Sequence, residues 1–233
     1  MCLYLLTLKN LRRILLHKQL WLFDMDGTLF QTERVAIEAF REVFVKLRHE
    51  GVQVPENVMD EQITGIFGYT HDRLWAQLFG RGLTVEEQVR ADDLLLGEEV
   101  RLIHSGRGAL YPDVKETLLT LKERGATLAV ASNGLSPYIE AIVDYYELRE
   151  LFVGLYSAGG YHVNSKVDLV RIACAEIPHE RGMMVGDRFT DVEAGLKNGL
   201  EVIGCAFGFA QEDEFRDAHR IVKRFSEILT MPE

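Results

Sequence analysis

The sequence predicts an α/β protein with a parallel sheet, helices on both faces of the sheet and a helical insertion after the first strand. Short apolar runs alternate with longer stretches of helical periodicity, which is typical of βαβ units. Gly, Asp, Ser or Asn residues lie next to these runs, as expected for buried strands that end in functional loops. The runs are Leu20–Phe23, Thr127–Ala131, Val153–Tyr156, Met183–Val185 and Val202–Ala206.

Helices are predicted between the apolar runs, over Val114–Arg124, Pro137–Tyr146, Lys166–Glu176 and Asp191–Asn198. Strands separated by helices of this length form a parallel, Rossmann-like sheet. Ligands of such sheets bind beyond the carboxyl ends of the strands, so we expect the chemistry of this chain to lie just after the apolar runs. A short Ile221–Val222 run predicts one further edge strand.

The segment from Arg34 to Gly108 breaks this alternation, because it contains helical patterns and no strand-like run. The patterns cover Val35–His49, His71–Phe79 and Val85–His104. We therefore predict three parts: an N-terminal extension over 1–19, an α/β core over 20–33 and 109–233, and a small all-α inserted domain over 34–108.

The composition excludes several classes of protein. The chain has 233 residues, 47% of them hydrophobic and 27% charged, which is ordinary for a folded protein. A net charge of −10 speaks against a nucleic-acid partner. Three cysteines without a CxxC pair predict reduced thiols in a cytoplasmic protein. No run approaches the roughly 18–20 apolar residues that a membrane span needs.

The N-terminal extension has a basic amphipathic pattern. It carries Lys9, Arg12, Arg13 and Lys18 without an acid, and leucines recur in it at helical spacing. Its charges follow the apolar residues instead of preceding them, which is not the order of a secretory signal. We interpret it as a helix packed on the domain or an extension without function, and consider organelle targeting or membrane-surface binding as the alternative.

Two aspartates follow the first apolar run. Asp24 and Asp26 lie two residues apart at a strand end, so an extended backbone would point both carboxylates the same way. Like charges are costly to bury together unless a cation compensates or one group is protonated. The pair therefore indicates a divalent metal, acid–base chemistry or both. Gly27 permits a sharp turn that leaves backbone N–H groups open to an anion. A helix cap with a turn aspartate is the alternative interpretation.

Polar residues also follow the later runs. Ser132 and Asn133 could donate hydrogen bonds to phosphate oxygens or form an ordinary turn. Lys166 opens a predicted helix, where the helix dipole favours anions, so either a buried anionic centre or solvent accounts for it. Asp187 ends the fourth run, and Asp191 follows on the same face of a helical turn or acts as its N-cap.

Together, these residues resemble the four motifs of the haloacid dehalogenase-like hydrolase superfamily. The motifs match as Asp24-x-Asp26-Gly-Thr, Ser132, Lys166 and Gly186-Asp187-x-x-x-Asp191, and the resemblance runs from about Trp21 to Phe209. Within this superfamily the chain is similar to phosphoglycolate phosphatase-like members, which carry a helical cap after the first motif. The predicted insertion stands where that cap would be.

The resemblance implies a Mg²⁺-dependent phosphatase that hydrolyses a small-metabolite phosphomonoester through an aspartyl-phosphate. By this resemblance Asp24 is the nucleophile, and Asp26 protonates the leaving oxygen and then activates water. Mg²⁺ would be bound by the Asp24 carboxylate, the Asp26 backbone carbonyl and Asp187. Asp191 would order a metal-bound water or Lys166, and is counted among the metal-site residues.

The same resemblance implies the residues that hold the phosphoryl group. Ser132 and Lys166 would contact its oxygens, with Lys166 compensating negative charge. Asn133, Gly27 and Thr28 complete the expected phosphate-binding set.

Two alternatives within the family stay open, a sugar phosphomutase and a non-catalytic ligand-binding member. Asp26 favours phosphoryl transfer over carbon–halogen cleavage, because family members that release a halide lack this aspartate. Phosphomutases of the capped type usually have a histidine shortly after the first motif, and the stretch Glu33-Arg34-Val35-Ala36 has none. Phosphonate-cleaving members need a cap lysine, but Lys46 is the only lysine in the predicted cap and lies inside a predicted helix.

Substrate choice is expected in the cap, above all in the loop from Gly65 to Arg73. Its glycines would let it approach the core, and Tyr69, His71 and Arg73 are candidates for binding the leaving group. Helix capping and solvent exposure are the alternative roles for this loop. Phosphoglycolate, nucleoside monophosphates, sugar phosphates and pyrophosphate all fit the motifs as substrates.

Overall fold

The computed structural model describes residues 19–67, 69, 71–210 and 212–230, so nearly all of the predicted extension over 1–19 lies outside it. The described residues form a six-stranded parallel sheet with the order β3-β2-β1-β4-β5-β6. The sheet confirms the predicted fold class, and the Ile221–Val222 run forms part of the edge strand. The strands are β1 (Gln19–Phe23), β2 (Thr127–Ser132), β3 (Phe152–Ser157), β4 (Arg181–Gly186), β5 (Glu201–Cys205) and β6 (Arg220–Val222).

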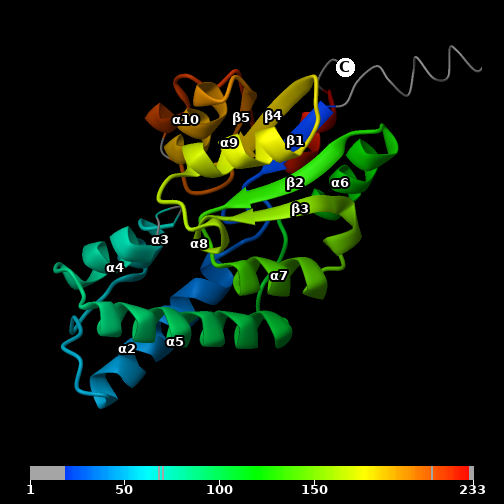
Figure 1. The fold of residues 1–233 in the computed structure, drawn as a ribbon. Coiled ribbons are helices and arrows are strands. Elements are labelled where there is room, and N and C mark those ends of the chain that lie inside the picture. The colour runs from blue at the N-terminus through cyan, green and yellow to red at the C-terminus, as the bar shows by residue number, and fades with distance from the viewer. Residues whose placement is uncertain (1–18, 68, 70, 211, 231–233) are drawn as a thin grey trace, which may run out of the picture.

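Helices cover both faces of this sheet (Figure 1). One face carries α9 (Lys166–Glu176) and α10 (Phe189–Lys197), and the other carries α6 (Val114–Glu123) and α7 (Ser136–Tyr145). Shorter elements complete the core: η1 (Arg149–Leu151), α8 (Ala158–Tyr161), η2 (Glu212–Phe215) and η3 (Phe225–Thr230).

The central strand β1 is apolar because both of its faces are buried. Leu20 and Leu22 belong to the hydrophobic cluster beneath α9, whereas Trp21 and Phe23 belong to the cluster on the side of α6 and α7. A strand covered on both sides reads as a continuous apolar run, which is the pattern that predicted it.

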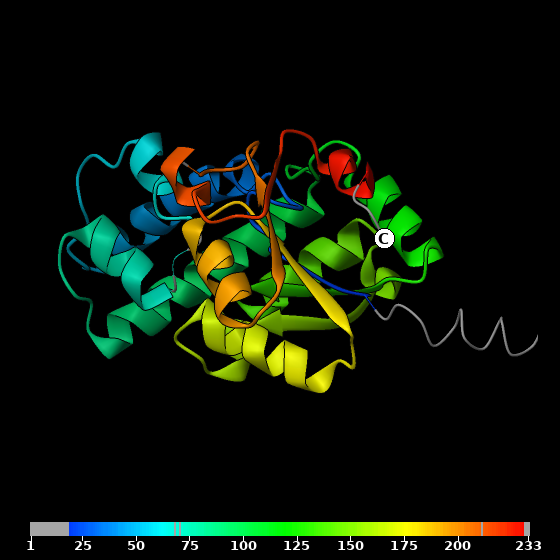
Figure 2. The ribbon, with the colours of Figure 1, turned by 90° about the horizontal axis from the view of Figure 1, so that it is seen from above.

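Four helices follow β1, and Figure 2 shows them gathered at one end of the sheet. They are α2 (Glu33–His49), α3 (Asp60–Thr64), α4 (His71–Phe79) and α5 (Val85–His104). The described part of 34–108 contains no strand, as predicted. The five-residue helix α3 was not predicted, because one turn is too short to show a helical period. We call the stretch from α2 to α5 the helical segment.

The helical segment has its own aromatic centre. Trp75 is buried, packs edge-on against Phe40 at 5.4 Å between ring centroids and contacts Phe79 at 5.9 Å. At its other end, α5 begins with a capping box: Thr84 Oγ1 accepts the Glu87 N–H at 3.2 Å, and Glu87 accepts the Thr84 N–H at 2.9 Å. Helix α5 then packs between α2 and α7, which joins the helical segment to the core.

The expectations about membrane spans and cysteines can be compared with the described residues. Among the described residues, no helix combines the length and the apolar character needed to cross a bilayer. Cys174 is half-buried and Cys205 is buried, and both carry free thiols.

Candidate active site

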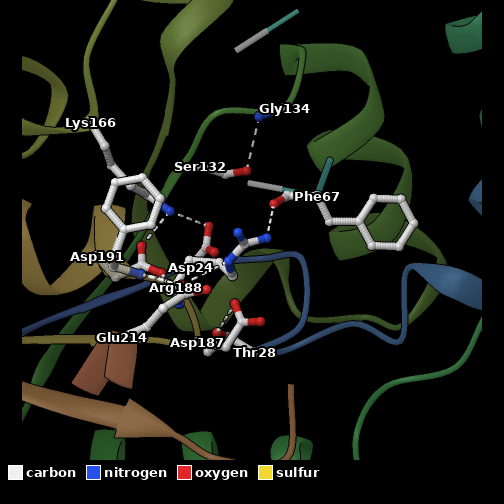
Figure 3. Close-up of polar contacts among 11 residues, drawn as sticks. Asp24, Thr28, Phe67, Ser132, Gly134, Lys166, Asp187, Arg188, Asp191 and Glu214 are labelled. Atoms are coloured by element: carbon white, nitrogen blue, oxygen red, sulfur yellow. Dashed lines mark hydrogen bonds and ion pairs between the residues drawn. The ribbon is translucent and has the colours of Figure 1, made fainter. Parts of the chain in front are cut away.

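Three aspartates meet at the carboxyl edge of the sheet (Figure 3). Asp24 follows β1, Asp187 follows β4, and Asp191 lies in the first turn of α10. One carboxylate oxygen from each lies within 4.8 Å of the others, and all three side chains are buried. The meeting results from the sheet itself, because β1 and β4 are paired in register up to Phe23 and Val185.

The cation of this cluster is Lys166, the first residue of α9. Its side chain is 2% exposed, and its Nζ lies 2.6 Å from Asp24 Oδ1 and 2.5 Å from Asp191 Oδ1 (Figure 3). Burial alone would lower the pKa of Lys166, but the two carboxylates outweigh it and raise that pKa. The buried acids therefore account for a lysine at a helix N-terminus, where the dipole disfavours it.

The charges of the cluster do not balance. Among the described residues the cluster holds three carboxylates and one ammonium, and this ammonium pairs with Asp24 and Asp191. Burial, and then the neighbouring Asp191 charge, raises the pKa of Asp24 well above its ordinary value. The same two causes raise the pKa of Asp187 to about 8. The site thus favours any added positive charge.

Asp187 is held by the loops on both sides of it. Its Oδ2 accepts the Phe209 N–H at 2.6 Å, and its Oδ1 accepts the Thr28 hydroxyl at 3.4 Å. Gly27 lies against it with a φ of +75°, and a Cβ on Gly27 would stand 2.2 Å from Asp187 Oδ2. Only glycine fits at this position.

The expectation of open backbone N–H groups does not hold for Gly27 itself. Its N–H donates to the Phe30 carbonyl at 3.0 Å within the turn, so it is not open to an anion. The turn that Gly27 makes possible is closed by a hydrogen bond from its own N–H. Gly27 contributes space beside Asp187 instead.

Asp191 has two partners on opposite oxygens. Its Oδ2 accepts the Arg188 N–H at 3.0 Å, while Oδ1 faces Lys166. Helix α10 therefore begins at Phe189, two residues before the predicted start, and Asp191 is the third helical residue instead of the N-cap. A Cβ on Gly186 would lie 2.1 Å from Asp191 Cγ, which explains the glycine of this motif.

The carboxylate of Asp26 stands apart from the three-carboxylate cluster. Its Oδ1 accepts two hydroxyl hydrogen bonds, from Thr32 and from Tyr138, both at 2.6 Å. The expectation that the carboxylates of Asp24 and Asp26 stand together is therefore wrong in part: both line one cavity, but they face different partners. The strand ends at Phe23, so the two-residue alternation does not extend to Asp26.

The predicted phosphate-binding pair lies at the end of β2. Ser132 is fully buried, and its Oγ accepts the Gly134 N–H at 3.1 Å, which is the turn chemistry considered above (Figure 3). Asn133 is buried and lines the same cavity as Asp24 and Asp26.

This cavity lies between the strand ends and the helical segment. The core lines it with Asp24, Asp26, Thr32, Asn133, Gly134, Leu135 and Tyr138. The helical segment lines it with Ala36, Phe40, Ile66, Phe67, Tyr69, Leu74, Leu95 and Glu99.

Glu99 is the one acid that the described helical segment contributes to the lining. Glu99 is 9% exposed. Its burial, and to a smaller extent the charges of Asp26 and Asp92, raise its pKa well above the ordinary value. Sequence reasoning missed it because a glutamate within a long helix carries no motif.

The predicted leaving-group residues fare differently. Tyr69 lines the cavity. Arg73 is not among the lining residues: it is exposed, and its guanidinium stacks on the Tyr69 ring at 4.2 Å. Its part in binding the leaving group stays a prediction. The side chain of His71 lies outside the described part of the structure. Lys46 forms an ion pair with Glu98 at the contact between α2 and α5.

Arg188 joins the helical segment to the site, and sequence reasoning missed it as well. Its guanidinium donates to the Phe67 carbonyl at 2.5 Å and pairs with Glu214 at 3.0 Å (Figure 3). Phe67 also packs edge-on against Phe209, whose N–H holds Asp187. The loop before α4 is thereby connected to the carboxylate cluster through Arg188 and Phe209.

A model of the haloacid dehalogenase-like hydrolases matches residues 19–199, most of the chain. The chain belongs to the haloacid dehalogenase-like hydrolase family. This haloacid dehalogenase-like chain is 31% identical over 203 residues to "Tyrosine-protein kinase PtkA" of Mycobacterium tuberculosis, covering 84% of this chain and 64% of that protein. The chain thus spans less than two thirds of that relative's length.

Two further comparisons agree with the family. The chain is 24% identical over 200 residues to a phosphoglycolate phosphatase of Vibrio parahaemolyticus, which covers 80% of this chain and 83% of that enzyme. The crystal structure of CbbY from Rhodobacter sphaeroides in complex with phosphate has the same fold. Its TM-score is 0.77 at 24% identity, over 91% of this chain and 96% of that chain.

Proposed function

We propose that this hydrolase is a Mg²⁺-dependent phosphatase of small phosphomonoesters that works through an aspartyl-phosphate. The observation that supports it is the buried cluster of Asp24, Asp187, Asp191 and Lys166 beside a cavity. Such a cluster suits phosphoryl transfer, which depends on positioning and on stabilising charge.

The donor set fits Mg²⁺. It consists of carboxylate oxygens, which hard divalent cations prefer over nitrogen or sulfur. Asp24 and Asp187 would hold the ion, together with the backbone carbonyl of Asp26, and Asp191 would order the ligands around it. When bound, the ion supplies positive charge that offsets the charges of the nucleophile and the phosphoryl group.

Each side chain then has a role. A carboxylate oxygen of Asp24 attacks phosphorus, and the bond to the alcohol oxygen breaks. Asp26 gives that oxygen a proton and later takes one from the water that hydrolyses the acyl phosphate. The hydroxyls of Thr32 and Tyr138 orient Asp26, since both donate to its Oδ1. Lys166 favours the ionised form of Asp24 and so opposes the effect of burial.

The test is hydrolysis of p-nitrophenyl phosphate with Mg²⁺, with Asp24→Asn as the variant. We expect Asp24→Asn to lose at least about 10³-fold in kcat, because no other group can form the covalent intermediate. A chelator should stop the wild-type reaction, and added Mg²⁺ should restore it. Asp93→Asn makes the same chemical change on the exposed face of α5 and should keep full activity. Equal activity in Asp24→Asn would refute the proposal.

A second candidate, a phosphotransferase, is favoured by the 31% identity to the protein named tyrosine-protein kinase. An aspartyl-phosphate formed from ATP could pass its phosphoryl group to a tyrosine hydroxyl instead of to water. Incubation with γ-labelled ATP separates these outcomes, because a kinase labels protein tyrosine and a phosphatase releases labelled phosphate. A sugar phosphomutase would interconvert sugar phosphates with little net release, and a non-catalytic member would bind phosphate esters without turnover.

A further inference from the structure

The cavity has two halves of different chemistry. The core half carries Asp24 and Asp26, where the proposed reaction takes place. The half from the helical segment is made of apolar and aromatic side chains around a single acid, Glu99. Because the phosphoryl group would lie against Asp24, the alcohol part of the substrate extends toward Phe40, Leu95 and Glu99.

Glu99 has no cation beside it in the described lining. Among the lining residues that the structure describes, none is Lys, Arg or His. Arg73 is exposed and stacked on Tyr69, and Lys46 is paired with Glu98. Arg188 is already engaged by Glu214 and the Phe67 carbonyl.

This lining disfavours a second anion on the substrate. A carboxylate or second phosphate on the alcohol part would be desolvated by apolar walls and would lie near Glu99, which is costly without a compensating cation. A hydroxyl or ammonium group would instead donate a hydrogen bond to the buried Glu99 carboxyl. The apolar walls would hold the carbon chain between the two polar ends.

We propose that Glu99 is a specificity-determining residue, and that the substrate is a phosphomonoester of an alcohol with an apolar stretch and a hydroxyl or amine at its far end. This inference rests on the proposed phosphatase function and narrows its substrate class. It sets this chain apart from enzymes whose substrates carry a second anionic group, such as phosphoglycolate.

The experiment compares three esters of equal length: 6-aminohexyl phosphate, 6-hydroxyhexyl phosphate and 5-carboxypentyl phosphate. For the wild-type chain with Mg²⁺, we expect kcat/KM for the amine and hydroxyl esters to exceed that for the carboxylate ester by at least about 10-fold. Glu99→Gln should reduce this ratio to within about 3-fold, because the amide has no ionisable carboxyl and its N–H can donate a hydrogen bond to the carboxylate ester.

Glu86→Gln is the matched control, since it makes the same change on α5 at an exposed position outside the lining. It should keep the wild-type ratio. A wild-type chain that hydrolyses the carboxylate ester as well as the others would overturn the inference, whatever the variants do. The inference would also be overturned if Glu99→Gln and Glu86→Gln both kept the wild-type ratio of kcat/KM values.

Binding separates this inference from the proposed function. Calorimetry with Asp24→Asn and Mg²⁺ measures the affinity for each ester without turnover. If Asp24→Asn binds the amine and hydroxyl esters more tightly but the wild-type chain hydrolyses no ester, the role of Glu99 is supported and the phosphatase function is refuted. Hydrolysis of p-nitrophenyl phosphate together with equal affinities for all three esters would do the reverse.

Discussion

The two halves of the cavity differ in how strictly their residues are constrained. On the core side, each acid has a defined partner, and Gly27 and Gly186 stand where no side chain fits. On the side of the helical segment, the lining is set by the packing of α2, α4, α5 and the loop before α4, and most of its members are apolar residues without a polar partner to fix them. We therefore expect the core side to determine the chemistry and the helical segment to determine which molecule undergoes it.

The largest expected effect comes from removing the buried cation. Lys166→Met leaves three buried carboxylates without their counter-charge, so we expect a loss of about 3–5 kcal/mol in the free energy of unfolding. Turnover should also be lost. Urea unfolding with and without Mg²⁺ measures this, and Mg²⁺ should stabilise Lys166→Met more than the wild type because it replaces the missing charge.

The matched control is the lysine of the helical segment. Lys46 pairs with Glu98, but its side chain is 41% exposed. Lys46→Met should therefore cost about 1 kcal/mol or less and leave the response to Mg²⁺ unchanged. If Lys166→Met and Lys46→Met lost similar free energies of unfolding, burial would not explain the difference between the lysine of the core and that of the helical segment.

The same contrast explains what the sequence could predict. The apolar runs predicted the strands because strands buried on both faces leave a continuous signal, as Leu20 to Phe23 do. The acids and Lys166 were predictable because parallel strands bring their carboxyl ends to one edge. The start of α10 was wrong by two residues, because Asp191 caps the helix from its third position, which spacing alone does not separate from an N-cap.

The residues that sequence reasoning missed depend on tertiary packing. Tyr138 reaches Asp26 across 112 positions of the chain, and Arg188 reaches Phe67 across 121. Neither contact has a local pattern. The position of Arg73 has the same origin, because the direction of an exposed side chain on α4 depends on its neighbour Tyr69.

Glycine substitutions compare the two halves through space alone. Gly27→Ala forces a Cβ to 2.2 Å from Asp187 Oδ2 at a φ of +75°, so we expect a loss of about 1–3 kcal/mol and weaker Mg²⁺ affinity. Gly97 lies exposed within α5 with nothing within 4 Å of a Cβ, so Gly97→Ala should stabilise by about 0.5–1 kcal/mol. Thermal unfolding and Mg²⁺ titration measure both. A loss of stability in Gly97→Ala, or no loss in Gly27→Ala, would contradict the conclusion that space is restricted at Gly27 and open at Gly97.

Tyr138 tests the boundary between the halves. Tyr138→Phe removes one of two hydrogen bonds to Asp26 but keeps the ring, which packs edge-on against Phe30 at 6.4 Å. We expect kcat to fall by about 3–10-fold with little change in KM, because Asp26 is less well oriented as acid and base. Tyr145→Phe, on the exposed end of α7, is the control. A change in KM alone would place Tyr138 in substrate binding instead.

The smallest effect should be a pH-dependent gain in stability at Glu99. Burial, followed by Asp26 and Asp92, raises the pKa of Glu99 in the folded chain, while unfolded Glu99 titrates near 4.5. Above pH 4.5 the folded chain therefore holds a proton that the unfolded chain releases, so this residue lowers stability as pH rises toward the folded pKa. Glu99→Gln lacks this penalty. Its melting temperature should exceed that of the wild type by about 2–4 °C at pH 7, and the two should converge below pH 4.5.

Glu87, on the same helix, gives the opposite sign and serves as the internal comparison. Hydrogen bonds from Arg81 and from the Thr84 backbone lower its pKa to about 2, so its contribution is present above pH 4.5 and is lost as pH falls toward 2. Glu87→Gln should therefore differ from the wild type at pH 7 by a lower melting temperature, and the difference should shrink in acid. If the melting temperatures of both variants changed with pH in the same way, the environment of Glu99 would resemble the exposed surface of α5. The distinction between the two halves of the cavity would then have no basis.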